Sequence, residues 1–412
     1  MKRKKGTSTA ESSFPNIIIP EEIIVEILSR LSLDSLVRFT LVSKQWRSLI
    51  SDISVAKTGP PIVLVLSDSG ARAYSFSPHS IDQHQQEVLH TKSVRVPWNM
   101  NAFVNRYKIR LLGSCKGLLL MHASEDLFLR NPLTRFFKKV LAFDRLRDEN
   151  YRVRSGLCYD STSDEYKAVL ALAHNTPSYG GEFVVVGRLR GKSWRAIHFP
   201  YRVRTANSGP IVNENLHWYA SKNDSGSYFL SPHQIIYFDA HMDKFEEVPM
   251  PDPRGEDGDV ICGLGALDGC LCMFRCNGEN SVELLVMKEY GVQNSWTSII
   301  AVSDGLTSSR YYKKLAPLGY TKNGEILTWG WDSHGWHIIR AFDRTDNSHR
   351  RISNPKDRLY VTAYEESFIT PTDYNWEEEV QRREATYVEH IYRSRKKKMN
   401  KNGYWTTEYI KS

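Results

Sequence analysis

Residues 268–274 read Asp-Gly-Cys-Leu-Cys-Met-Phe, a turn-forming pair followed by a short apolar run. This order is typical of a tight turn that leads into a β-strand. A similar arrangement recurs at Lys116-Gly117, Asp164-Glu165, Glu214-Asn215 and Asn323-Gly324. The equivalent positions 117, 166, 215, 269 and 324 are separated by 49, 49, 54 and 55 residues. An internal repeat of about 50 residues is a period found in β-propellers.

Several of these repeats contain a second apolar run that ends in a polar turn, at residues 127–132, 235–239 and 338–343. Because no long helical pattern separates the runs, we predict a large all-β domain over residues 59–373. A β-propeller-like ring is favoured, because repeated antiparallel blades cover one another and leave few exposed strand edges. Two sheets packed as a sandwich are the alternative architecture.

The two ends of this domain are predicted to meet. Residues 62–66 and 73–76 are short runs joined through a turn segment at residues 68–70, which is typical of a hairpin. Residues 360–369 are expected to return beside that hairpin and close the ring. The number of blades stays open, because residues 59–110 predict either half a blade or an irregular lead-in.

Residues 15–58 follow a helical pattern instead. Pro20 suits the first turn of a helix, and the acidic residues at 21 and 22 complement the positive end of its dipole. Apolar residues at 23, 24, 27, 28 and 31 form one stripe, and Ser43 is a candidate cap for a third helix that carries Trp46. We predict a small all-α module of three helices. Its wide apolar stripes must be covered by a partner or by the rest of the chain.

Positive charge gathers at the two ends of the chain. Of the net charge of +8, residues 2–5 carry +4 and residues 393–412 carry +6, so residues 6–392 carry −2. We interpret residues 1–14 as a disordered basic N-terminus. Residues 374–412 are interpreted as a C-terminal extension with a basic tail, which we expect to be disordered beyond Ser394. These tails are solvated ends or, alternatively, nuclear-import or anion-binding segments.

The apolar runs are too short to span a bilayer, and the Ser/Thr-rich residues 6–14 do not resemble the apolar part of a secretory signal. We therefore expect no membrane partner and a location in the nucleus, the cytoplasm or both. All six cysteines are expected to be reduced thiols in such a compartment.

Three motifs outline catalytic or metal chemistry but lack its context. Residues 113–117 resemble a nucleophile elbow around Cys115, yet a strand pattern rather than a helix follows them. Residues 187–193 resemble a phosphate loop with one residue too few between the glycines. Cysteines 262, 270, 272 and 276 lack the paired spacing of a zinc site. We predict no catalytic residue, metal or cofactor; an enzymatic alternative rests on Cys115 alone.

Trp329, Trp331 and Trp336 lie within eight residues, around two glycines. Most tryptophans of such a domain belong in its core, but three at this spacing exceed what one hairpin can easily bury. We predict that this cluster offers an aromatic anchor to a target. The other candidate recognition loops are residues 175–181, 221–227, 251–259 and 331–336, because loops carry function on rigid β scaffolds.

The helical segment can be compared with a known family. It reads Ile-Pro-Glu-Glu at residues 19–22, Glu-Ile-Leu-Ser-Arg-Leu at 26–31 and Val-Ser-Lys-Gln-Trp at 42–46. In this order the segments closely resemble an F-box. Through residues 113–119, 131–135, 156–160 and 267–272, the body resembles the F-box-associated domain of plant F-box and kelch-related proteins. The likeness runs from about residue 17 to 370.

This resemblance implies an adaptor subunit without catalytic residues. The F-box would bind a Skp-type adaptor and, through it, a cullin-RING ubiquitin ligase, while the β domain recruits an unknown target protein. The residues that match the family's adaptor-binding motif, as contacts or as supporting core, are Ile19, Pro20, Ile24, Ile27, Leu28, Leu31, Leu36, Val42 and Trp46. Ile19 stands where Leu is usual and Ser32 where Pro is common, which affects the affinity for the adaptor.

A second function from a different class is a ligase-independent propeller that binds a polyanion such as RNA through its basic tails. The near-neutral body does not favour nucleic acid as a partner. A steep dependence of binding on salt would distinguish this alternative.

Overall fold

The computed structural model describes residues 19–54, 61–67, 73–76, 110–353, 359–369, 398–399 and 405–406, with gaps at 124, 135, 149, 176–181, 206–207, 223–232, 254–259, 278–280, 303–314 and 332–336. Contacts within the chain divide it into two compact units, residues 1–58 and 59–412. The division falls where the sequence pattern changes from helical to β. Among the described residues, no helix is long and apolar enough to cross a membrane.

The first unit contains the three predicted helices, α1 (Glu21–Ser29), α2 (Leu33–Phe39) and α3 (Lys44–Ser54). Pro20 precedes α1, and its carbonyl accepts hydrogen bonds from the N–H groups of Ile23 and Ile24 at 3.1 and 3.2 Å. The hydroxyl of Ser43 accepts a hydrogen bond from the Trp46 N–H at 3.1 Å, which confirms the predicted cap of α3. The buried core of this unit contains Leu28, Leu33, Leu36, Leu49 and Ile50.

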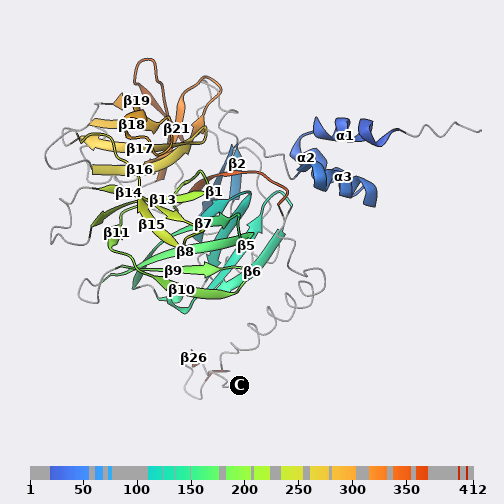
Figure 1. The fold of residues 1–412 in the computed structure, drawn as a ribbon, viewed down its shortest axis with the longest axis horizontal. Coiled ribbons are helices and arrows are strands. Elements are labelled where there is room, and N and C mark those ends of the chain that lie inside the picture. The colour runs from blue at the N-terminus through green and yellow to red at the C-terminus, as the bar shows by residue number, and fades with distance from the viewer. Residues whose placement is uncertain are drawn as a thin grey trace, which may run out of the picture. The chain divides into compact units, whose positions relative to one another are not determined.

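The second unit contains five antiparallel blades of four or five strands (Figure 1). The first blade comprises β3 (Arg110–Cys115), β4 (Leu118–Ala123), β5 (Asp126–Asn131) and β6 (Phe136–Ala142). The second comprises β7 (Tyr151–Asp160), β8 (Glu165–His174), β9 (Phe183–Arg188) and β10 (Ser193–Ile197). The third comprises β11 (Tyr201–Val203), β12 (Ile211–Val212), β13 (Asn215–Lys222), β14 (Gln234–Asp239) and β15 (Lys244–Glu247).

The last two blades repeat the four-stranded arrangement. The fourth comprises β16 (Val260–Leu267), β17 (Cys270–Asn277), β18 (Ser281–Met287) and β19 (Trp296–Val302). The fifth comprises β20 (Ala316–Tyr320), β21 (Ile326–Trp331), β22 (His337–Phe342) and β23 (His349–Ser353). Short 3₁₀ helices lie at Asp144–Arg147 and Gln293–Ser295.

A three-stranded sheet joins the two ends of the domain. It contains β1 (Pro61–Ser67) between β2 (Ala73–Phe76) and β24 (Leu359–Glu365). β1 pairs with β24 along its whole length, from Pro61 opposite Glu365 to Ser67 opposite Leu359. The predicted hairpin and the predicted returning strand are both confirmed. We call this sheet the closing sheet.

Neighbouring sheets meet in a circular order. β3 lies against β7, β7 against β13, β13 against β16, β16 against β20, β20 against β24, and β24 against β3. This order is that of a five-bladed β-propeller whose ring is completed by the closing sheet. It confirms the predicted ring and excludes the sandwich.

Each of the five turns of the sequence repeat joins two paired strands of one blade: β3 and β4, β7 and β8, β12 and β13, β16 and β17, and β20 and β21. Backbone φ is positive in each of them, at Lys116, Asp164, Glu214, Asp268 and Gly324, which is the conformation that tight hairpin turns require. Contacts such as Gly263 with Leu315 and Gly265 with Pro317, and Leu112 with Ser155, show that neighbouring inner strands run in the same direction, and Lys116 contacts Glu214 across the ring. We infer that these turns lie at one end of the ring, which we call the turn face. The opposite end is the loop face.

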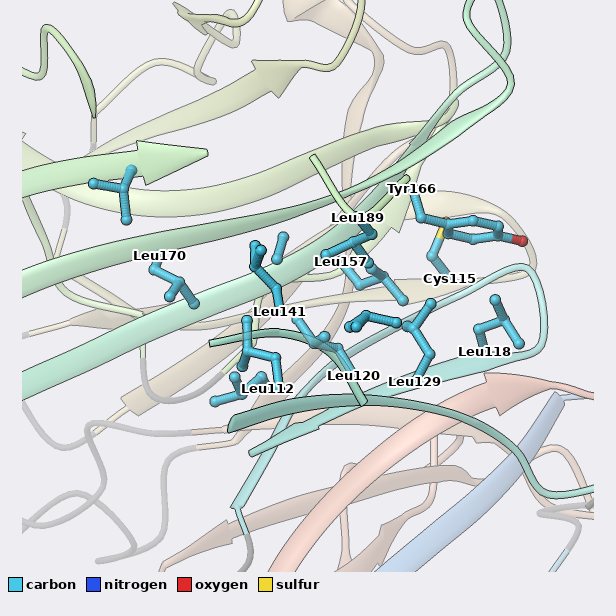
Figure 2. Close-up of a cluster of buried hydrophobic side chains, with 14 of the residues drawn as sticks. Leu112, Cys115, Leu118, Leu120, Leu129, Leu141, Leu157, Tyr166, Leu170 and Leu189 are labelled. Carbon is cyan, nitrogen blue, oxygen red and sulfur yellow. The ribbon is translucent and has the colours of Figure 1, made fainter. Parts of the chain in front are cut away.

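The core lies between blades rather than in one central mass. Figure 2 shows the cluster between the first two blades, where Leu112, Leu120 and Leu129 face Leu157 and Leu170. Close approach of the backbones is part of this packing, since a Cβ at Gly113 would lie 2.6 Å from the backbone N of Leu157. Gly113, the first glycine of the elbow-like motif, is therefore explained by contact between blades.

Side chains also connect neighbouring blades at their outer strands. The indole N–H of Trp194 in the second blade donates to the Ala142 carbonyl of the first at 2.8 Å. Trp296 in the fourth blade donates to the Pro249 carbonyl, just after the third, at 2.9 Å. The repeat thus places equivalent tryptophans at equivalent junctions, which agrees with the expectation that most tryptophans serve the blade packing.

Two expectations from the sequence are corrected. Cys262 and Cys276 form a disulfide, whereas all six thiols were expected to be reduced. The physical reason is that strands β16 and β17 bring their Cα atoms to 6.2 Å, within bonding reach. In the basic tail, β25 (Lys398–Met399) pairs with β26 (Trp405–Thr406), so the expected disorder does not hold for these four residues. The predicted N-terminal segment 1–14 and residues 374–397 lie outside the described residues.

Candidate functional site

The structure separates the predicted adaptor-binding residues into core and surface. Leu28 and Leu36 are completely buried and form the core of the helical module. Ile24, Leu31 and Trp46 are half-buried. The exposed members of the set are Ile19, Pro20, Ile27 and Val42.

Two further exposed apolar residues were not in the predicted set. Ile23 is 50% exposed and lies one helical turn before Ile27 in α1. Leu41, beside Val42, is 80% exposed. The spacing of four residues between positions 23 and 27 was the available signal for Ile23, because residues four apart share one face of a helix. We call Ile19, Ile23, Ile27, Leu41 and Val42 the exposed apolar set.

Local interactions hold the segment that carries Leu41 and Val42. Trp46 packs edge-on against Phe39, with ring centroids 5.5 Å apart and planes at 86°. The Arg47 Nε donates to the Thr40 carbonyl at 3.3 Å, which connects α3 to the end of α2. Trp46 therefore supports the turn between the helices with one part of its ring and leaves the rest accessible. Such a partly exposed aromatic is suited to a protein interface.

The second unit has a cavity of about 620 Å³ at the centre of its ring, lined by residues from the five blades and the closing sheet. Its charged lining residues are Lys116, Glu214, Asp268 and Glu365. Lys116 Nζ lies 2.7 Å from Glu214 Oε1 and 4.2 Å from the centroid of the Tyr159 ring. One lysine therefore connects three blades at the turn face, among a majority of acidic side chains.

The cavity lining includes the thiol of Cys115, on which the enzymatic alternative rests. As far as the structure describes it, the lining contains no histidine. Burial raises the pKa of the Cys115 thiol to about 12, so that this thiol stays protonated at neutral pH. Within the described part of the chain, no group of three or more His, Cys, Asp or Glu side chains is arranged to hold a metal ion.

The predicted aromatic anchor is corrected at Trp329. This side chain is only 3% exposed and packs in the core of the fifth blade with Leu327 and Ile339. The physical reason is its position within β21, where Trp329 belongs to the same buried cluster as Val63 and Val361 of the closing sheet. Trp331 ends β21, and its side chain lies outside the described residues, as does all of Trp336.

The predicted recognition loops are flanked by strand ends at one end of the ring. Residues 175–181 follow β8, residues 221–227 include the end of β13, residues 251–259 precede β16, and residues 331–336 follow β21. Each of these strand ends is opposite to the turn of its own blade, at the loop face. Most of their residues lie outside the described part, namely 176–181, 223–227, 254–259 and 332–336.

The chain enters and leaves the propeller at the turn face. Pro61, the first residue of β1, is opposite Glu365, which lines the cavity near Lys116. After β24 the chain reaches Ile369, whose carbonyl accepts a hydrogen bond from Asn131 Nδ2 at the turn-face end of β5.

Some solved structures resemble the chain at low identity. TolB from Acinetobacter baumannii is 8% identical, with a TM-score of 0.44, over 74% of this chain and 66% of that one. The Dos1 propeller is 10% identical, with a TM-score of 0.35, over 71% of each chain. Similarity at this level carries no information on function.

Relatives in sequence are much closer. The F-box/kelch-repeat protein At3g23880 of Arabidopsis thaliana is 31% identical over 73% of this chain and 83% of its own length. The F-box protein CPR1 of the same plant is 29% identical over 74% of this chain and 78% of its own length. Family models match an F-box-like segment at residues 18–58 and an F-box associated beta propeller domain at residues 62–368. The chain therefore belongs to the family of plant F-box proteins with a C-terminal F-box-associated β-propeller.

Proposed function

We propose that this chain is the substrate-recruiting subunit of an SCF-type cullin-RING ubiquitin ligase, located in the nucleus, the cytoplasm or both. Its helical module binds a Skp-type adaptor, and its propeller binds the protein to be ubiquitinated. The observation that carries this proposal is the exposed apolar set on a module that already has its own buried core. Exposed apolar residues gathered on so small a module favour a protein interface.

The positions at which the chain enters and leaves the propeller suggest which end of the ring binds the target. Because Pro61 and Ile369, where the described part of the propeller begins and ends, lie at the turn face, we assign target binding to the loop face. Ubiquitin transfer takes place elsewhere in the ligase. The contribution of this chain is proximity, since holding two proteins together raises the effective concentration of one near the other. This role needs no catalytic residue or cofactor.

Capture of a purified Skp-type adaptor by the full-length chain tests the adaptor half of the proposal. The wild type should retain the adaptor, and Ile27→Asp should reduce binding by about 100-fold, as expected when a charge is placed in an apolar interface. Met242→Asp is the matched control, because Met242 is 60% exposed but belongs to the propeller. Equal binding by all three proteins would contradict the assignment of the surface.

Deletion of the basic tails tests the alternative. Removal of residues 2–5 and 393–412 should leave adaptor capture unchanged. Loss of a strongly salt-dependent association with RNA after that deletion, in a chain that does not bind the adaptor, would favour the polyanion-binding function instead.

A further inference from the structure

The four residues after β24 cross from the closing sheet to the first blade. We call residues 366–369 the strap. Asn131, at the end of β5, donates hydrogen bonds from Nδ2 to the carbonyls of Ser367 and Ile369 at 2.8 and 2.9 Å. These bonds connect residues more than 230 positions apart in the chain.

Asn131 is chemically matched to this position. Its side chain is completely buried. Its Oδ1 accepts hydrogen bonds from the N–H groups of Leu133 and Thr134 at 2.9 and 3.3 Å, while Nδ2 supplies both donors to the strap. An amide provides two acceptor sites and two donors, whereas a carboxylate would provide acceptors only.

The turn at Lys116 and Gly117, which is also in the first blade, contacts the same strap. Ser367, which is buried, donates from its hydroxyl to the Lys116 carbonyl at 2.9 Å, and the Ile369 N–H donates to that hydroxyl at 3.3 Å. Gly117 has a φ of +77°, and a Cβ there would lie 2.1 Å from Ser367 Oγ. Gly117 is therefore required both by the turn and by the close approach of Ser367.

These side-chain contacts occur where backbone pairing stops. In the described residues, the closing sheet and the first blade are separate sheets with no ladder of hydrogen bonds between β24 and β3. Besides packing, the junction has the strap contacts and a bond from Ser114 Oγ to the Ala363 carbonyl at 3.0 Å. Lys116, whose carbonyl holds Ser367, extends the connection to Glu214 in the third blade.

We propose that Asn131 and the Lys116-Gly117 turn form a latch for the strap, and that this latch holds the propeller ring closed. Release of the latch frees β24 and its partner β1, while the other blades stay folded. Asn131 is thus a positioning residue for ring closure rather than a residue of one turn.

Hydrogen exchange of the full-length chain tests the latch. Asn131→Asp should make amide exchange in residues 61–67 and 359–365 at least about tenfold faster, because two buried hydrogen bonds are lost at once. Exchange in residues 215–222 and 234–239 of the third blade should not change. Asn150→Asp is the matched control. Asn150 is exposed, and its replacement by Asp adds the same charge beside a strand of the second blade. Amide exchange in the closing sheet and in the third blade should be unchanged in this variant.

Ser367→Ala is the milder variant, which decides the question if Asn131→Asp fails to fold. It removes one hydroxyl and should accelerate exchange in residues 61–67 and 359–365 by about threefold. Faster exchange in all blades alike, or unchanged exchange in the closing sheet, would overturn the proposal and leave Asn131 as an ordinary turn residue.

Discussion

The helical module and the propeller differ in how many of their large apolar side chains are exposed. Of the eight large apolar side chains that are exposed in the described chain, five lie in the module and three in the propeller, although the propeller is several times larger. The propeller covers its apolar surface by placing each blade against the next. The module cannot do so with three short helices. In the described residues, the propeller therefore buries most of its large apolar side chains within itself, whereas the module leaves a larger share of them exposed.

The largest loss of stability is expected from a substitution in the core of the helical module. Leu28 and Ile27 are adjacent in α1, but Leu28 is completely buried and Ile27 is 49% exposed. We expect Leu28→Ala to cost about 2–5 kcal/mol and to unfold the module, whereas Ile27→Ala should change stability by less than about 0.5 kcal/mol. Hydrogen exchange of residues 21–54 measures both. Similar protection in the two variants would remove the distinction between core and contact residues.

The propeller should be sensitive to backbone crowding between blades. A Cβ at Gly263 would lie 1.5 Å from the Leu315 carbonyl oxygen, whereas nothing lies closer than 3.6 Å to one at Gly191. Gly263→Ala should cost about 3 kcal/mol or more in a denaturant titration, while Gly191→Ala should be nearly neutral. Adaptor binding should survive in both, because the module is a separate compact unit with its own buried core. Loss of adaptor binding in Gly263→Ala would show that the two units are not independent.

Acid should weaken the propeller through His217. Burial lowers the pKa of this imidazole to about 4, and its Nε2 lies 2.7 Å from the Tyr290 hydroxyl. Between pH 6.5 and 4 the unfolded chain binds a proton at this position that the folded chain does not, so stability is lost as the pH falls through this range. The contribution is about 3 kcal/mol at most. His217→Gln should make the unfolding free energy depend less on pH between 6.5 and 4. An unchanged pH dependence in this variant would show that His217 is not the group responsible.

The smallest effect should come from the tryptophans that connect blades. Trp194→Phe and Trp296→Phe each remove one indole hydrogen bond to the preceding blade and keep an aromatic ring. Each should cost about 1 kcal/mol in thermal or chemical unfolding. Because the two positions are equivalent in the repeat, their costs should also be alike. A large difference between them would show that the repeat does not extend to these junctions.

The sequence predicted the helices, the repeat and the meeting of the two ends, because each leaves a local pattern. Ser43 before Trp46 signals a cap, and the turn pairs before apolar runs signal hairpins. Trp329 could not be placed correctly, because its burial depends on which sheet faces β21. The hydrogen bonds of Asn131 and Ser367 could not be predicted either, because they join segments that are distant in the sequence and no local sequence pattern signals them. Likewise, only the strand register shows that Cys262 and Cys276 lie close enough to bond.

Calorimetric titration of a purified Skp-type adaptor into the full-length chain tests whether the exposed apolar set is an adaptor-binding surface. We expect one adaptor to bind per chain, with a negative heat-capacity change from burial of the exposed apolar set. We also expect Ile27→Asp combined with Val42→Asp to abolish the binding heat while the propeller remains folded. A folded wild-type chain that does not bind the adaptor, or a double variant that binds as well as the wild type, would contradict this assignment.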